Sequence, residues 1–157
     1  PSPRRSLILG STSSYRRALL ERLRIAFQVV APEVDETPID GESPRDLACR
    51  LALAKARAVV RLYPQAVVIG SDQVADLNGE PLGKPLTHAR AVAQLQAMRG
   101  RKVVFQTAVA VVCTETGFCE QDLAPVEVQF RMLTDAEIEA YLQAEKPYDC
   151  AGSARSV

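Results

Sequence analysis

The sequence has little of what marks several common classes of protein. Its 157 residues include 19 basic and 19 acidic side chains, so no overall field attracts nucleic acid or a membrane surface. No apolar stretch approaches the length of about 18 residues that predicts a membrane-spanning helix. The first residues also lack the apolar region of a signal peptide. We therefore expect a cytoplasmic protein that acts on neither nucleic acid nor membranes.

Cysteine and histidine are not arranged to hold a metal. The four cysteines show no CxxC spacing and have no histidine partners, which argues against a zinc site. Cys113 and Cys119 flank a predicted turn and could face each other, but thiols in the cytoplasm normally stay reduced. The one histidine, His88, follows the helix cap Thr87. We expect it to be an exposed residue without a catalytic role.

The sequence does contain an alternation of apolar runs and amphipathic stretches. Apolar runs predict strands at 7–10, 27–31, 66–71, 102–113 and 120–130. Capping residues followed by helical periodicity predict helices at 15–23, 43 to about 63, 87–98, and from Thr134 to just before Pro147. Asn78-Gly79 predicts a tight hairpin turn. With no linker or repeat, we expect a single α/β domain over residues 1–157, with a mixed twisted sheet and helices on both faces.

The segment between Arg5 and Arg17 is the most informative part of the chain. A short apolar strand, Leu7 to Leu9, is followed by a turn of small hydroxyl residues and then by a helix that opens with two arginines. Backbone N–H groups, hydroxyls and guanidinium groups at one point are what phosphate oxygens bind. The alternative is an ordinary strand-to-helix connection whose serine only caps the helix.

Further charged residues are predicted in loops and at element ends. Asp72 directly follows the buried strand 66–71, at the carboxyl end where open α/β sheets place their sites. Glu36 lies beyond another strand, Lys84 lies in Gly83-Lys84-Pro85, and Lys55 lies on the helix that begins at Ser43. Two carboxylates and several cations suit a triphosphate with a hard divalent cation. Taken singly, Asp72 could be a turn former, Glu36 a solvated loop acid and Lys55 a surface helix lysine.

In combination, these residues resemble the Maf family of nucleoside triphosphate pyrophosphatases over essentially the whole chain. The resemblance is carried by Ser11-x-Ser13-x-x-Arg16, Asp35-Glu36, Arg50-Leu51-Ala52-x-x-Lys55-Ala56, Gly70-Ser71-Asp72-Gln73-Val74 and Gly83-Lys84-Pro85. Within the family, the branch that acts on 7-methyl-GTP is similar at Tyr15, Gln73 and Tyr148-Asp149-Cys150-Ala151-Gly152-Ser153. Two departures are Ser14, where the family usually has proline, and Ala154-Arg155-Ser156-Val157, where the family continues. The resemblance implies that a C-terminal part is missing.

The resemblance implies hydrolysis of the α–β phosphate bond of a small-molecule nucleotide, dependent on Mg²⁺ or Mn²⁺ and commonly performed by a homodimer. Asp72 would accept the proton of the attacking water and would share the metal with Glu36. The substrate phosphates would be bound by five residues, namely Ser11, Ser13, Arg16, Lys55 and Lys84. Tyr15 and Gln73 would select the base, because an aromatic face attracts the cationic 7-methylguanine and an amide offers both a donor and an acceptor.

Three other functions remain open at this point. The substrate could be another non-standard or pyrimidine nucleoside triphosphate. The chain could instead be a non-catalytic nucleotide-binding regulator of cell division, or a binder of nucleic acid. The last reading rests on a basic cluster of arginines at positions 4, 5, 16, 17, 22 and 24. It is the weakest, because no aromatic residues interleave that cluster to stack on bases.

Overall fold

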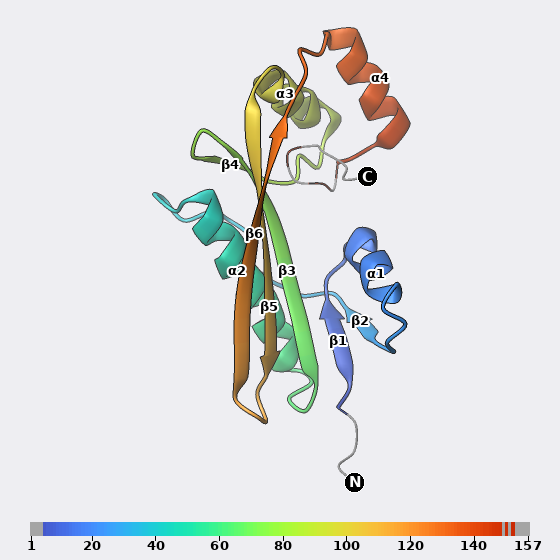
Figure 1. Ribbon diagram of the computed structural model, residues 1–157, viewed down its shortest axis with the longest axis vertical. Coiled ribbons are helices and arrows are strands. Elements are labelled where there is room, and N and C mark those ends of the chain that lie inside the picture. The colour runs from blue at the N-terminus through green and yellow to red at the C-terminus, as the bar shows by residue number, and fades with distance from the viewer. Residues whose placement is uncertain (1–4, 149, 151, 153–157) are drawn as a thin grey trace. The chain divides into compact units, whose positions relative to one another are not determined.

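The computed structural model describes residues 5–148, 150 and 152. These residues form six strands and four helices in nearly the order that the sequence predicts, and Figure 1 labels them. The strands are β1 (Leu7–Gly10), β2 (Gln28–Val30), β3 (Val67–Leu77), β4 (Glu80–Leu82), β5 (Lys102–Cys113) and β6 (Phe118–Gln129). The helices are α1 (Ser14–Glu21), α2 (Pro44–Val60), α3 (His88–Met98) and α4 (Asp135–Glu145).

The described strands form one mixed sheet, as predicted. Its strand order is β2-β1-β3-β5-β6, and the short strand β4 pairs with β3. Strand β1 is parallel to both β2 and β3, whereas β3 and β4 are antiparallel. The register places Gly10 opposite Gly70 and Leu9 opposite Ile69. The ends of β1 and of the first half of β3 therefore lie next to each other, which matters for the site below.

The chain divides into two compact units that share elements. The first unit contains residues up to Asp40, Leu47–Asp72 and Ala108–Leu123, and the second contains Gly41–Asp46, Gln73–Thr107 and the residues from Ala124 onward. Helix α2 and strands β3, β5 and β6 contribute to both units. That residues 1–157 behave as a single domain stays a prediction.

In the first unit, helices cover both faces of the sheet, as the sequence predicts. Helix α2 packs on one face, because a Cβ at Gly10 would lie 3.1 Å from Cγ2 of Val59. On the other face, Leu9 and Ile69 line a cavity of about 220 Å³ together with Leu19 and Leu20 of α1 and with Leu23, which follows that helix. The alternation of side chains along a strand sends Gly10 and Leu9 to opposite faces.

The second unit has a core of its own, which β3, β5, α3 and α4 share. Its buried apolar side chains are Ala75, Leu77, Ala91, Leu95, Met98, Val103, Phe105, Ile138 and Leu142. The capping box predicted at Thr134 is confirmed, since its hydroxyl accepts from Glu137 N while the Glu137 carboxylate accepts from Thr134 N. Thr87 caps α3 in the same way by accepting from Arg90 N. These caps begin the two helices that close this core.

The predicted end of the central strand is wrong. Strand β3 does not stop at Ser71 but continues to Leu77, so Asp72 lies within the strand rather than after it. The apolar residues Val74, Ala75 and Leu77 are buried, and their burial extends the strand past the polar residues at positions 71–73. The strand ends at the predicted hairpin turn. Asn78 and Gly79 have φ values of +52° and +88°, as such a turn requires, and join β3 to β4.

None of the four cysteines, all of which lie among the described residues, forms a disulfide. Among the described residues, none of the helices combines the length and the apolarity needed to cross a lipid bilayer.

Candidate active site

A glycine in the central strand lets α2 come close to the sheet. A Cβ at Gly70 would lie 2.6 Å from the backbone nitrogen of Ala56 and would also meet the carbonyl of Ala52. No larger residue fits there without moving the helix. Lys55 lies between these two contact residues in sequence, and Asp72 lies two positions after Gly70 on the same strand. The close approach therefore brings Lys55 to Asp72.

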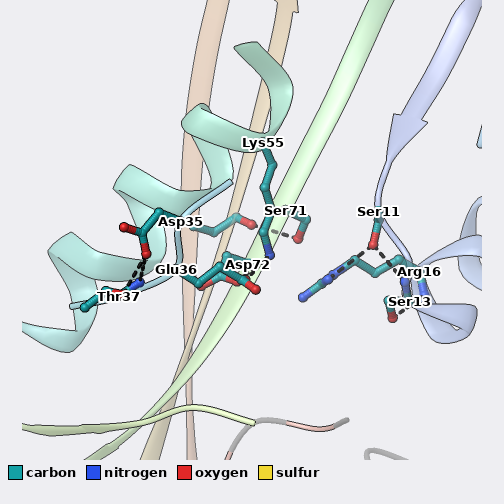
Figure 2. Close-up of polar contacts among 10 residues, drawn as sticks. Ser11, Ser13, Arg16, Asp35, Glu36, Thr37, Lys55, Ser71 and Asp72 are labelled. Carbon is teal, nitrogen blue, oxygen red and sulfur yellow. Dashed lines mark hydrogen bonds and ion pairs between the residues drawn. The ribbon is translucent and has the colours of Figure 1, made fainter. Parts of the chain in front are cut away.

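Lys55 joins two carboxylates at one point. Its Nζ donates to Oδ1 of Asp72 at 2.9 Å and forms an ion pair with Oε1 of Glu36 at 2.8 Å. Figure 2 shows the lysine side chain reaching from α2 to these two acids. The side chains of Lys55 and Asp72 are only 7% and 8% exposed, whereas that of Glu36 is 47% exposed. A buried lysine and aspartate are thus neutralised by each other, with Glu36 at the solvent side.

Burial raises the pKa of the Asp72 carboxyl above its ordinary value, because the charged form loses hydration. The neighbouring Glu36 acts in the same direction. Lys55 and Arg16 oppose the shift through their positive charges, and Lys55 also through its hydrogen bond. The result is a carboxylate of stronger basicity than an exposed aspartate, beside two cations that favour its charged form.

The loop that carries Glu36 is fixed by its neighbours. Oδ1 of Asp35 accepts from Thr37 N at 2.9 Å and from Thr37 Oγ1 at 2.6 Å, a turn that short polar side chains often form. These bonds lower the pKa of Asp35. Arg50 of α2 then donates to the Thr37 carbonyl at 3.2 Å. Asp35 therefore shapes the loop, while Glu36 faces Lys55 (Figure 2).

The turn after β1 forms a second polar group in the same unit. Oγ of Ser11 accepts from Ser13 N at 3.0 Å and from Arg16 Nη1 at 3.4 Å, and Ser13 caps α1 by accepting from Arg16 N. In these bonds each hydroxyl oxygen is an acceptor, so each hydroxyl keeps a hydrogen that it can donate. In Figure 2 the Arg16 side chain extends toward Asp72, and its positive charge acts to lower the pKa of that carboxyl.

The structure thus brings six of the predicted site residues into the first unit, near one another in Figure 2. They are Ser11, Ser13, Arg16, Glu36, Lys55 and Asp72. Ser13 caps α1, as expected of an ordinary strand-to-helix connection. The same position next to Arg16 is also compatible with a role in binding phosphate. Tyr15 is half-buried in the first turn of α1. The specific roles of these residues stay predictions.

Gln73 and Lys84 belong to the second unit. The Gln73 amide donates to Thr107 Oγ1 at 2.9 Å, so this side chain is oriented by β5. Lys84 is exposed on the loop between β4 and α3. Of the predicted motif at 148–153, positions 148, 150 and 152 are described; positions 149, 151 and 153 lie outside the described residues, as do the C-terminal residues 154–157.

The sequence reasoning gave no role to several residues that shape these groups. The Asp35-x-Thr37 spacing, typical of a side-chain turn, could have revealed the anchor of the Glu36 loop. The contact of Arg50 with that loop could not be read from spacing. His88 was expected to be an exposed residue without a catalytic role; it is instead half-buried and hydrogen-bonds to Tyr148 and Glu139, and its lack of a catalytic role stays a prediction.

The donor set suits a hard divalent cation. Among the described residues, no group of three or more histidine, cysteine, aspartate or glutamate side chains gathers to hold a metal. Glu36 and Asp72 nevertheless converge on one cationic atom. Magnesium is commonly bound by one or two carboxylates and completes its shell with water and phosphate oxygens. Chemically, the arrangement can hold polyanionic oxygens and accept a proton beside them.

Comparisons with known proteins show the family to which the chain belongs. A family model described as Maf-like protein matches residues 6–156. A protein of Albidiferax ferrireducens named 7-methyl-GTP pyrophosphatase is 70% identical over 152 residues, covering 97% of this chain and 76% of its own. A protein of the same name from a Polaromonas species is 71% identical over 152 residues, which cover 97% of this chain and 69% of that protein. The crystal structure of protein VC0702 from Vibrio cholerae is only distantly similar, with a TM-score of 0.49 and 10% identity over 95% of this chain and 86% of that one. From the family match and these relatives, the chain belongs to the family of Maf-like proteins.

Proposed function

We propose that this chain is a nucleoside triphosphate pyrophosphatase that converts 7-methyl-GTP to 7-methyl-GMP and pyrophosphate. The observation that carries the proposal is the buried Asp72 carboxylate, held by Lys55 and influenced by Arg16. The names of the relatives support both the reaction and the substrate.

Asp72 is the proton acceptor in this proposal. A water oxygen bonds to the α-phosphorus, the bond to the bridging oxygen breaks, and that electron pair leaves with pyrophosphate. The proton of the water passes to the Asp72 carboxylate. Because burial raises the pKa of Asp72, its carboxylate is a stronger base than an exposed one. General-base catalysis of this kind contributes about 10²–10⁴ in rate.

The cationic and hydroxyl groups bind the charge that moves onto the leaving group. Lys55 and Arg16 carry positive charge beside Asp72, and Ser11 has a hydroxyl hydrogen to donate. When the substrate phosphates arrive, Lys55 can share its hydrogens between the carboxylates and a phosphate oxygen, since an ammonium has three. Lys84 adds a further cation to the phosphate chain. Fixed donors of this kind stabilise a transition state because they need no rearrangement during the reaction.

Tyr15 and Gln73 select the base in the same proposal. A 7-methylated guanine carries a delocalised positive charge, which an aromatic ring attracts by about 1–2 kcal/mol in a desolvated pocket. Gln73 donates through its amide nitrogen to Thr107, which leaves its amide oxygen able to accept from the exocyclic amine of a guanine.

Metal dependence is part of the proposal, with Mg²⁺ or Mn²⁺ held by Glu36 and Asp72. When bound, such an ion neutralises charge on the phosphate oxygens. A homodimer and a cytoplasmic location, which the family resemblance implies, complete the proposal. Light scattering on the purified chain tests the dimer, and cell fractionation tests the location.

The experiment that tests the function is pyrophosphate release from 7-methyl-GTP, GTP, UTP and dTTP, with Mg²⁺ or Mn²⁺ present and with neither. We expect a clear preference for 7-methyl-GTP and a loss of about 10²–10⁴ in kcat for Asp72→Asn. Asp76→Asn is the matched control, because Asp76 lies on the same strand but binds Gly79 N in the hairpin turn. A preference for another nucleotide would move the substrate assignment, and no release from any nucleotide would refute the activity.

A further inference from the structure

The loop that carries Lys84 is held in place by backbone bonds at both ends. Gly83 O accepts from Gly152 N at 3.1 Å and from the Gln94 side chain at 3.0 Å. At the other end, Leu86 N donates to Tyr148 O at 2.9 Å. Leu86 also has a φ of +63°, a conformation that a leucine keeps only when its surroundings impose it.

Within the described part of the chain, the ammonium of Lys84 takes no part in the bonds that hold this loop. Lys84 is exposed, and the contacts that fix the loop are made by its neighbours, not by the lysine. Pro85, the next residue, is fully buried. The backbone on either side is therefore anchored while the lysine side chain faces solvent.

Tyr148, which holds Leu86, is held in turn by His88. Nδ1 of His88 lies 2.9 Å from the Tyr148 hydroxyl, and the two rings meet edge-on with centroids 6.0 Å apart. Nε2 of His88 lies 2.8 Å from Oε2 of Glu139, and Gln143 donates to the other oxygen of Glu139 at 2.9 Å. His88 thus links the first turn of α3 to α4 and to the tyrosine that fixes the loop.

The hydrogen positions on His88 follow from its partners. An ionised glutamate only accepts, so Nε2 of His88 carries a hydrogen toward Glu139. Nδ1 of the neutral ring then accepts from the Tyr148 hydroxyl, and in the charged ring it donates to the same oxygen. The Tyr148 hydroxyl and the Glu139 carboxylate therefore bind the two nitrogens of one ring.

We propose that His88 is a positioning residue for Lys84. By fixing Tyr148, it fixes the loop backbone at Leu86 and so fixes the point from which the Lys84 side chain reaches a substrate phosphate. This inference rests on the proposed function, in which Lys84 binds the phosphate chain. Positioning of this kind matters to rate, because a displacement of about 1 Å can cost on the order of 10² in turnover.

The test is a double-mutant cycle on kcat/KM for 7-methyl-GTP, with wild type, His88→Ala, Lys84→Ala and the double variant. We expect His88→Ala to lower kcat/KM about tenfold in the wild-type background and to have no further effect once Lys84 is alanine. Tyr148→Phe, which removes only the hydroxyl, reproduces the loss. His88→Asn, whose Oδ1 can accept from that hydroxyl, restores part of it. Equal losses from His88→Ala in both backgrounds would overturn the inference.

Amide hydrogen exchange at Leu86 gives a readout that does not depend on turnover. We expect faster exchange in His88→Ala and Tyr148→Phe, because the bond to Tyr148 O weakens. Gln96→Ala is the matched control, since the Gln96 amide links α3 to Asp135 at 3.3 Å but does not touch the loop; it leaves both readouts unchanged. An unchanged Leu86 amide in the two variants would refute the role of His88. A wild type without turnover would instead refute the proposed function.

Discussion

Replacement of Lys55 by methionine tests the buried charge cluster most severely. Methionine keeps much of the apolar stem but removes the ammonium that lies 2.9 Å from Oδ1 of Asp72 and 2.8 Å from Oε1 of Glu36. The buried Asp72 then loses its partner, which typically costs about 3–5 kcal/mol. Since the ordinary pKa of the carboxyl is 3.8, Asp72 can instead take up a proton at pH 7, at about 1.4 kcal/mol for each pH unit above that value. That route limits the loss to roughly 4 kcal/mol.

The assay is urea unfolding of wild type and Lys55→Met at pH 7 and at pH 4. We expect a loss of about 3–4 kcal/mol in the free energy of unfolding at pH 7, within a total of about 5–15 kcal/mol for a domain of this size. Near pH 4 the loss shrinks toward zero, because Asp72 is then readily protonated in the unfolded chain as well. Lys102→Met, at an exposed position of β5, is the control and changes stability by less than about 0.5 kcal/mol.

A second variant separates charge from packing. In Lys55→Met combined with Asp72→Asn, no buried charge is left unpaired, so the double variant loses less stability than the sum of the two single losses. The reasoning is refuted if Lys55→Met costs less than about 1 kcal/mol at pH 7, or if its cost is the same at both pH values.

Three further predictions concern the pH dependence, the packing at Gly70 and the base. Because burial raises the pKa of Asp72, we expect kcat/KM to fall on the acid side with an apparent pKa above 3.8. We also expect the wild type to lose stability relative to Asp72→Asn as the pH rises through that raised pKa, because the folded chain then gives up a proton that it binds more tightly than the unfolded chain does. The opposite trend in pH-dependent unfolding would contradict the shift. Gly70→Ala overpacks the contact with α2 and costs about 1–3 kcal/mol in thermal unfolding, whereas Gly83→Ala, with nothing within 4 Å of its added Cβ, costs almost nothing; equal effects would refute the close approach. Tyr15→Leu lowers the preference for 7-methyl-GTP over GTP about tenfold in competition assays while Tyr15→Phe keeps it, and an unchanged preference in Tyr15→Leu removes Tyr15 from base recognition.

Local signals in the sequence predicted most of the fold. The strands at 7–10 and 102–113, the Thr134 capping box and the Asn78-Gly79 turn all depend on neighbours within a few positions, and all are confirmed. The end of β3 was missed because the burial of Val74 and Ala75, which continues the strand past Asp72, depends on residues far along the chain.

The candidate site was accessible to sequence reasoning only in part. The residue types at Glu36, Lys55 and Asp72 suggested phosphate and metal chemistry, but the meeting of all three at one nitrogen depends on how closely α2 packs at Gly70. Neither periodicity nor spacing reports that distance. The contact of His88 with Tyr148 was missed for the same reason, since 60 positions separate them.

Product analysis by ³¹P NMR tests the central claim most directly. With 7-methyl-GTP and a divalent cation, we expect the wild type to yield pyrophosphate and 7-methyl-GMP in equal amounts. Asp72→Asn yields neither on the same time scale, while Asp76→Asn yields both at the wild-type rate. Orthophosphate with a nucleoside diphosphate as the first products, or an undiminished rate in Asp72→Asn, would contradict the assignment of the hydrolytic site to Asp72.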